Sequence, residues 1–95
     1  MKICFTEAAW EDYQYWVQLQ ELKTPRKKLK RIGELVKNIQ QSPLEESGKP
    51  GLGKPEPLRF NLTGCWSRRI DSEHRLVYQI NPDGGLILLQ CRYHY

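Results

Sequence analysis

The stretch that decides the fold runs from Leu58 to Tyr95, LRFNLTGCWSRRIDSEHRLVYQINPDGGLILLQCRYHY. Its apolar residues come in short alternating segments, LRFNL, CWSRRI, RLVYQI and LILLQCRYHY, separated by turn-forming residues. An alternation with a period of two, interrupted by such residues, is typical of β-strands joined by hairpins. We therefore expect a meander of three or four antiparallel strands over the second half of the chain.

The first half of the chain has a different periodicity. Lys2 to Thr6 alternates and predicts a short opening strand, after which Thr6 can cap a helix that runs to about Gln20. Thr24-Pro25 is a helix start signal, and an apolar stripe at helical spacing follows as far as Gln41. The segment ESGKPGLGKPEP, residues 46–57, is rich in glycine and proline and predicts an irregular loop.

This order of elements predicts an α+β fold in which two helices pack on one face of a twisted antiparallel sheet of four to five strands. With 95 residues, we expect a single domain over residues 1–95. No apolar run is long enough to cross a bilayer, so we expect no membrane partner and a cytoplasmic protein. The odd number of cysteines, three without a CxxC pair, predicts buried thiols in a reducing compartment.

Basic residues are concentrated in the second helix. The chain has 15 Lys and Arg against 11 Asp and Glu, a net charge of +4, and phosphate is the natural counterpart of such a surface. The alternative interpretation is a charged helix face that only keeps the protein soluble. The residues of this basic helix that we single out as candidate nucleic-acid contacts are Arg26, Lys27, Lys30 and Arg31.

Arginines also recur on the expected strands. Because side chains on a strand alternate between its two faces, only one of Arg68 and Arg69 can face a given site. In the hairpin that turns near Asn81 to Gly85, Arg75 lies about five residues before the turn and His94 about nine after it. Both fall toward the same open end, with an offset of roughly 13 Å that a bulge could adjust.

The chain ends in His94 and Tyr95, directly after a strongly apolar segment that should anchor them. A neighbouring terminal carboxylate favours a protonated His94, which is the form that a general acid requires. We expect His74 to be a surface or capping residue beside Glu73. A zinc site or a Cys–His nucleophile is disfavoured because Cys91 and His94 fall on opposite faces of a strand, and no motif for a nucleotide cofactor occurs.

The segment GKPEPLRFNLTGCWSRRIDSEHRLVYQI, residues 53–80, with the terminal CRYHY and the opening KICFTEAAWEDYQYW, resembles the YoeB toxins of the RelE/ParE superfamily. The resemblance covers essentially the whole chain. It implies a RelE-like fold and a bacterial toxin that cleaves mRNA in the A site of the 30S ribosomal subunit and so inhibits translation. It also implies a metal-independent endoribonuclease without a cofactor, neutralised by a YefM-like antitoxin, and a homodimer as one assembly.

The resemblance also implies roles for individual residues. Glu56, the carboxylate of the Lys-Pro-Glu-Pro loop, falls on the catalytic base, and Arg75 falls on the strand arginine that stabilises the phosphate. The terminal pair His94 and Tyr95 completes the catalytic set. Independently of the resemblance, the cations that could help Arg75 to bind RNA and phosphate are Lys54, Arg59 and one of Arg69 and Arg68. Arg59 stands where the family more often has lysine.

Two other functions fit the same sequence. A non-enzymatic toxin like those of the ParE branch would bind DNA gyrase through protein contacts and would need no base, acid or phosphate clamp. A simple RNA-binding module would keep its function when Glu56 becomes glutamine. The set of Glu56, Arg75, His94 and Tyr95 favours the endoribonuclease over the gyrase-binding toxin, and the effect of Glu56→Gln would separate it from the RNA-binding module.

Overall fold

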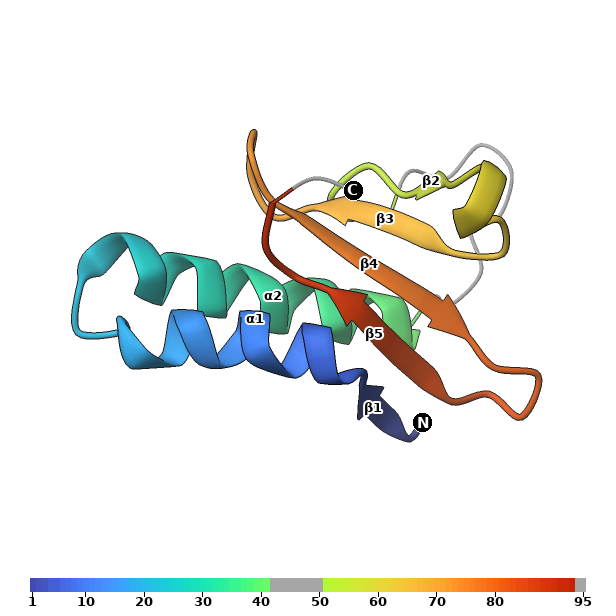
Figure 1. Ribbon diagram of the computed structural model, residues 1–95, viewed down its shortest axis with the longest axis horizontal. Coiled ribbons are helices and arrows are strands. Elements are labelled where there is room, and N and C mark those ends of the chain that lie inside the picture. Colours follow the sequence, from blue (N-terminus) through green and yellow to red (C-terminus); the bar gives the residue numbers. More distant parts are fainter. Residues whose placement is uncertain (42–50, 94–95) are drawn as a thin grey trace.

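The computed structural model describes residues 1–41 and 51–93, and within them two helices pack against one face of a five-stranded sheet (Figure 1). The expected α+β class is therefore confirmed. The elements in chain order are β1 (Ile3–Phe5), α1 (Glu7–Gln18), α2 (Lys23–Gln41), β2 (Glu56–Pro57), the 3₁₀ helix η1 (Phe60–Leu62), β3 (Trp66–Arg69), β4 (Arg75–Ile80) and β5 (Leu86–Gln90).

Both helices begin close to the expected positions. The Thr6 hydroxyl accepts a hydrogen bond from the amide of Ala9 (3.2 Å), which satisfies one of the free N–H groups of the first turn. The second helix starts at Lys23, two residues before the expected first position at Pro25, so Thr24 lies inside the first turn and is not the cap. The helix ends at Gln41, as the sequence predicts.

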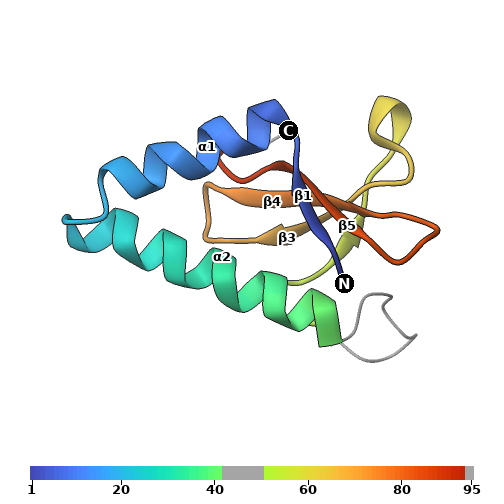
Figure 2. The same ribbon diagram turned by 90° about the horizontal axis from the view of Figure 1, so that it is seen from below.

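The main core lies between the helices and the sheet. Alternate residues of β4, Leu76 and Tyr78, point toward the helices and are at most 1% exposed. The two helices run antiparallel along this side of the sheet, as Figure 2 shows. The helical contribution to this core comes from Ala9, Trp16, Ile32, Leu35 and Ile39. Neither helix is long and apolar enough to cross a membrane, among the residues that the structure describes.

The sheet is mixed, which corrects the expectation of an antiparallel one. Its strand order is β1-β5-β4-β3-β2, and β1 pairs with β5 in parallel, with Ile3 opposite Leu86 and Phe5 opposite Leu88. A parallel pair needs a long connection between its strands, and here everything from α1 to β4 provides it. The first and last strands of the chain are thus neighbours.

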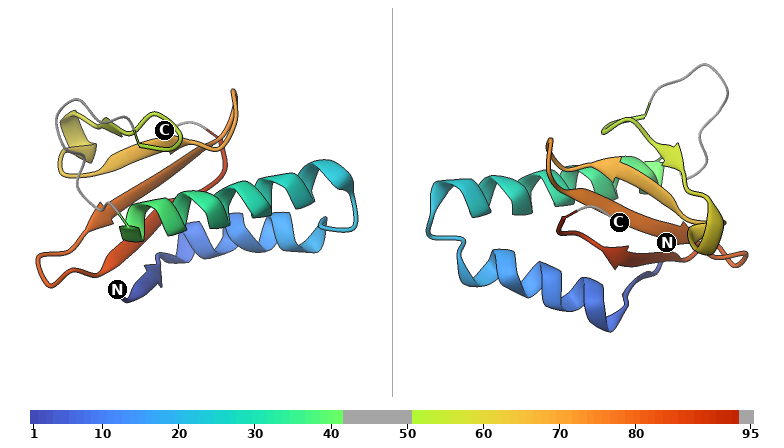
Figure 3. Two further views of the ribbon diagram at one scale, coloured as in Figure 1. Left: turned by 180° about the vertical axis from the view of Figure 1, so that it is seen from behind. Right: turned by 45° about the horizontal axis from the view of Figure 1, so that its top comes forward.

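The segment LRFNL is not a strand. It alternates like one, yet Phe60–Leu62 form a 3₁₀ turn, and the two-residue strand β2 lies just before it, inside the segment expected to be irregular. Leu58 and Leu62 pack with Cys65 and Val77 in a second, smaller cluster on the sheet face that the helices leave free. The apolar spacing therefore reflects one side of a folded-over loop, visible above β3 in Figure 3.

The cysteines divide differently from the prediction. Cys65 and Cys91 are buried, as expected, whereas Cys4 is exposed because the edge strand β1 turns it outward. Burial raises the pKa of the Cys91 thiol to about 12, with the Asp12 carboxylate adding to the rise and the Arg92 guanidinium opposing it. A thiol with such a pKa stays protonated at neutral pH and is not a nucleophile.

Candidate active site

The strand register brings three candidate residues onto the helix-free face of the sheet. Glu56 of β2 pairs with Ser67 of β3, and Ser67 pairs with Val77, whose side chain belongs to the outer cluster. Two residues further along the same face, Arg69 of β3 pairs with Arg75 of β4. Diagonal neighbours on a sheet face have Cα atoms roughly 7–8 Å apart, so the exposed Glu56 lies within side-chain reach of Arg69.

Of the two consecutive arginines, Arg69 is exposed and Arg68 is 2% exposed. The Arg68 guanidinium donates from Nε to the Tyr78 hydroxyl (3.0 Å) and from Nη1 to the Leu52 carbonyl (3.2 Å) and to the Asn38 side chain. The expectation that Arg68 contacts RNA phosphate is therefore replaced by a structural role. Arg69 is the member of the pair that faces the candidate site.

Arg68 holds the loop that leads to Glu56. Its bond to the Leu52 carbonyl is matched by a bond from the Leu52 amide to Asn38 Oδ1 (3.2 Å), and the Arg69 amide donates to the Gly53 carbonyl (2.7 Å). Gly53 has φ +79°, and a Cβ there would lie 2.8 Å from a methyl carbon of Leu35. Only glycine fits this position, three residues before the candidate base.

The turn between β3 and β4 positions Arg75. Asp71 Oδ1 accepts from the amides of Glu73 (2.8 Å) and His74 (2.7 Å), which is an Asx-type turn. Arg75 Nη1 donates back to the carbonyls of Asp71 (2.7 Å) and His74 (3.1 Å). Both bonds leave from Nη1, and no protein partner of Nε or Nη2 is found within the described part of the chain. Those two nitrogens can donate to an anion.

The same turn is joined to α2 by an ion pair. Lys28 Nζ lies 2.5 Å from Asp71 Oδ2, with both side chains less than a third exposed. Desolvation of the Asp71 carboxyl acts to raise its pKa, but the hydrogen bond from Lys28, the two backbone amides and the charge of Lys28 outweigh it and hold the pKa at about 2. The native turn therefore favours the ionised carboxylate.

We expect Asp71→Asn to lower the free energy of unfolding near neutral pH by about 1 to 2 kcal/mol, because the amide keeps an acceptor for the turn but loses the ion pair. A lowered pKa contributes stability above the unfolded value near 4, and this contribution is lost as pH falls toward 2. Urea unfolding of both proteins at pH 6, 4 and 2.5 should show the difference shrinking with acid. An undiminished difference at pH 2.5 would contradict the ion-pair account.

The last strand ends earlier than expected. β5 stops at Gln90, after a bulge in its pairing with β4 between Val77 and Tyr78. The chain then bends, with Tyr93 at φ +64°, and the Arg75 amide donates to the Tyr93 carbonyl (3.0 Å). The bulge and bend place Tyr93 beside Arg75, which a straight strand with the expected offset would not. His94 and Tyr95 lie outside the described residues.

Both the amide and the carbonyl of Tyr93 form hydrogen bonds. Its amide donates to Nδ1 of His74 (2.7 Å), and its carbonyl also accepts from Gln90 Nε2 (3.1 Å). His74 is 8% exposed and packs edge-on against Trp16, with a ring separation of 4.9 Å. The expectation of a surface or capping role for His74 is wrong, because the imidazole is an interior acceptor for the tail.

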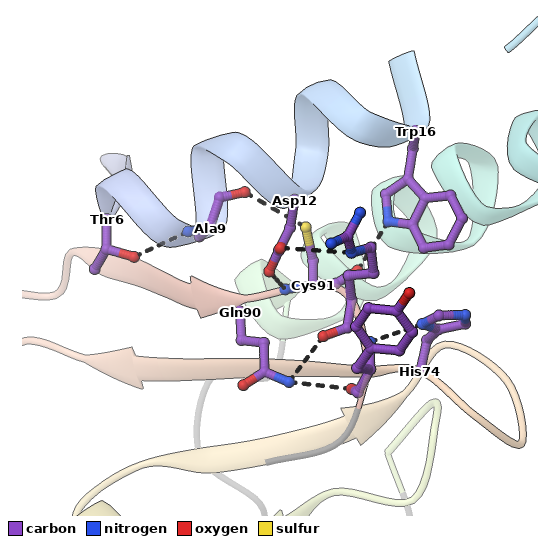
Figure 4. A network of polar contacts seen from close by, with 9 residues as sticks. Thr6, Ala9, Asp12, Trp16, His74, Gln90 and Cys91 are labelled. Atoms are coloured by element: carbon purple, nitrogen blue, oxygen red, sulfur yellow. Dashed lines mark hydrogen bonds and ion pairs between the residues drawn. The ribbon is translucent and has the colours of Figure 1, made fainter. Parts of the chain in front are cut away.

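Helix α1 supplies a second anchor for the tail, drawn in Figure 4. The Cys91 amide donates to Asp12 Oδ2 (3.1 Å), and the Trp16 indole N–H donates to the Cys91 carbonyl (2.9 Å). These side chains replace the backbone partners that Cys91 loses when β5 ends. The three residues before His94 are therefore fixed relative to both the helix and the sheet.

We expect Trp16→Phe to lower the free energy of unfolding by about 2 kcal/mol, because the buried Cys91 carbonyl loses its donor and the smaller ring leaves a gap. Trp10→Phe on the same helix is the matched control, since Trp10 is 49% exposed, and we expect a change of no more than about 0.5 kcal/mol. Chemical denaturation of the two variants measures both. Equal effects would contradict a specific role for the indole.

The remaining candidates lie around this centre or on α2. Lys54 and Arg59 are exposed on either side of β2, and Arg26, Lys27 and Lys30 are exposed on α2. Arg31 is partly buried and lies 3.9 Å from Glu34. Within residues 1–41 and 51–93, no group of three His, Cys, Asp or Glu side chains is placed to hold a metal ion.

The sequence did not indicate the residues that support the site. These supporting residues are Asp12, Trp16, Asn38, His74, Tyr78 and Gln90, which bind backbone or guanidinium groups of other elements. The one signal in the sequence for such supporting residues was the pair of consecutive arginines on a strand. Because side chains on a strand alternate, one arginine had to point inward, where it needs buried partners.

A two-helix layer on this mixed sheet is the fold of RelE-type toxins. The chain belongs to the family described as "YoeB-like toxin of bacterial type II toxin-antitoxin system", whose sequence profile matches residues 5–95. It is 52% identical to Toxin YoeB of Synechocystis over 100% of this chain and 98% of that protein. Two structures from Staphylococcus aureus, a YoeB–YefM complex and a YoeB dimer, each match with a TM-score of 0.82 and 43% identity, over 100% of this chain and 98% of theirs.

Proposed function

We propose that this toxin is a metal-independent endoribonuclease that cuts mRNA in the ribosomal A site. The observation that carries the proposal is the common face of Glu56, Arg69 and Arg75, with the backbone of Tyr93 bonded to Arg75. Tyr93 is the residue directly before His94 in the chain. An acid, a base and cationic groups around one phosphodiester suit RNA cleavage by general acid–base catalysis.

The proposed reaction is an internal transfer at phosphorus. Glu56 takes the proton of the ribose 2′-hydroxyl while the 2′-oxygen forms a bond to the adjacent phosphorus. The bond from phosphorus to the 5′-oxygen breaks, and His94 donates a proton to that leaving oxygen. The products are a 2′,3′-cyclic phosphate and a 5′-hydroxyl, and the 5′-hydroxyl is a diagnostic end for mapping.

The arginines stabilise the charge that develops on the phosphate. Nε and Nη2 of Arg75 are the donors for its oxygens, and the turn bonds to Nη1 preorganise them. Arg69 stands directly opposite Arg75 in the register and adds a second guanidinium. Lys54 and Arg59 neutralise the flanking backbone, and Tyr95 orients the phosphate or stacks on a base.

The basic surface of α2 supports a ribosomal setting. Arg26, Lys27 and Lys30 are exposed on a helix that packs on the sheet face opposite to the site. They can therefore contact ribosomal RNA phosphates, together with Arg31, while the open face holds the mRNA. Arg68 takes no part in RNA binding in this proposal, because its guanidinium is buried.

The partners follow from the same surface and from the relatives. We infer that a YefM-like antitoxin segment covers the open face, since the site presents several cations to an acidic peptide. One of the similar Staphylococcus aureus structures is a YoeB–YefM complex, and another is a YoeB dimer. We extend both to this chain, an antitoxin partner and a homodimer, and expect it to act in the bacterial cytoplasm.

The proposal is tested by mapping 5′-hydroxyl ends of an mRNA incubated with the purified toxin, with and without programmed ribosomes. We expect cuts at the A-site codon only when ribosomes are present, and loss of these cuts for His94→Gln. Inhibition of DNA gyrase without mRNA cleavage would favour the ParE-like alternative. Undiminished cutting by His94→Gln would remove the assignment of the general acid, and efficient site-specific cutting of free RNA would remove the ribosome requirement.

A further inference from the structure

Phe60 is the most exposed large apolar side chain of the described residues, at 91%. Its backbone φ is +58°, in the left-handed region that bulky aromatic residues rarely adopt. Its apolar neighbours in sequence, Leu58 and Leu62, pack into the outer cluster instead. A strained backbone that directs an aromatic ring into solvent points to a function for the ring outside the fold.

The turn that presents Phe60 is tightly bonded. The Phe60 carbonyl accepts from the Thr63 hydroxyl (2.7 Å) and amide (3.1 Å), and the Leu58 amide donates to the Cys65 carbonyl (2.9 Å) across the base of the loop. The ring is therefore displayed by a turn that is closed at its base. A fixed orientation lowers the entropic cost of stacking a planar ligand on the ring.

Phe60 shares a cavity with the candidate base. The cavity has a volume of about 540 Å³ and is lined by the continuous segment from Glu56 to Leu62. It includes the exposed Arg59, whose guanidinium can bind a phosphate next to the stacked ring. A carboxylate, a cation and an aromatic ring along one segment match the ribose, phosphate and base of a single nucleotide.

We propose that Phe60 stacks on the nucleobase of the mRNA nucleotide that flanks the cleaved phosphate, and that it is a substrate-binding residue of the site. This inference rests on the proposed cleavage reaction. Arg69 and Arg75 lie on the side of Glu56 away from Phe60, so the cleaved phosphate is held on that side, and the base and the flanking phosphate contacted by Arg59 are held on the other. Stacking accepts any base, but purines offer the larger surface.

The test compares Phe60→Leu, Phe60→Trp and the wild type on programmed ribosomes. We expect Phe60→Leu to reduce the single-turnover cleavage rate at subsaturating toxin by about 10-fold, mainly through weaker binding, and Phe60→Trp to retain it. Because the ring is exposed, the melting temperature of both variants should equal that of the wild type. A second set of mRNAs carries one abasic nucleotide at each position of the A-site codon in turn.

The abasic series identifies the stacked base. Loss of one particular base should slow the wild type and have no further effect on Phe60→Leu, because the ring and that base act as a pair. If Phe60→Leu cuts the mRNA at the same rate as the wild type, the stacking role is overturned while the proposed reaction stands. If Phe60→Leu slows cleavage by the same factor on every abasic mRNA, the ring contacts ribosomal RNA. If Phe60→Leu weakens only antitoxin binding, the ring contacts a protein. Either result overturns the inference.

Discussion

Glu56→Gln is expected to lower the rate of A-site cleavage by roughly 10²- to 10⁴-fold, the range for removal of a general base. Glutamine keeps the shape of the side chain and one carbonyl oxygen, but it cannot take the 2′-hydroxyl proton. Single-turnover cleavage on programmed ribosomes measures the rate, and ribosome binding should be unchanged. A variant that cuts at the wild-type rate would show that Glu56 is not the base.

The stability of the variant separates catalysis from folding. Glu56 is exposed on an edge strand of two residues, so we expect its free energy of unfolding to change by no more than about 0.5 kcal/mol. Glu11→Gln is the matched control, since Glu11 is exposed on α1 and belongs to the opposite layer. It should cut as fast as the wild type, and a loss of rate with this variant would indicate a general effect of charge.

Arg75→Gln is expected to lower the cleavage rate by roughly 10²- to 10³-fold, as for loss of one preorganised donor to a developing anion. The amide cannot replace Nε and Nη2, the two guanidinium nitrogens that have no partner within the described residues. The variant also loses the bonds from Nη1 to the turn carbonyls, so some loss of stability is expected as well. Rates are therefore compared well below the melting temperature of both proteins.

Two further variants separate the roles of Arg75. Arg75→Lys keeps the charge but not the fork, and it should recover only part of the rate if bidentate geometry is required. Asp71→Asn weakens the same turn while leaving Arg75 in place, and it should cut close to the wild-type rate. If Asp71→Asn lost as much activity as Arg75→Gln, the turn itself and not the guanidinium would explain the defect.

The elements with strong periodicity were predictable from the sequence. The opening strand, both helices and the hairpin that turns at Asn81 to Gly85 follow from alternation, helical spacing and turn residues, and the structure confirms them. LRFNL shows the limit of that approach. Leu58 and Leu62 alternate like strand residues, yet Phe60 between them takes a positive φ that no alternation pattern reveals.

The site was predictable as a set of residue types and less so as a geometry. The strand pairing from β2 through β3 to β4 puts Glu56, Arg69 and Arg75 on one face of the sheet. The sequence alone could not decide which of the two consecutive arginines was buried. That choice depends on Asn38 and Tyr78, which lie on other elements. The parallel pairing of β1 with β5 is likewise a long-range contact that local patterns do not encode.

This pairing has a consequence for synthesis. Of the five strands, a ribosome makes β1 first and its partner β5 last, and the anchored segment from Cys91 to Tyr93 comes later still. Until β5 has emerged, a nascent copy has neither its closing strand nor the tail that carries His94. The chain therefore completes its sheet and its proposed proton donor only late in translation, and a partly synthesised copy lacks both.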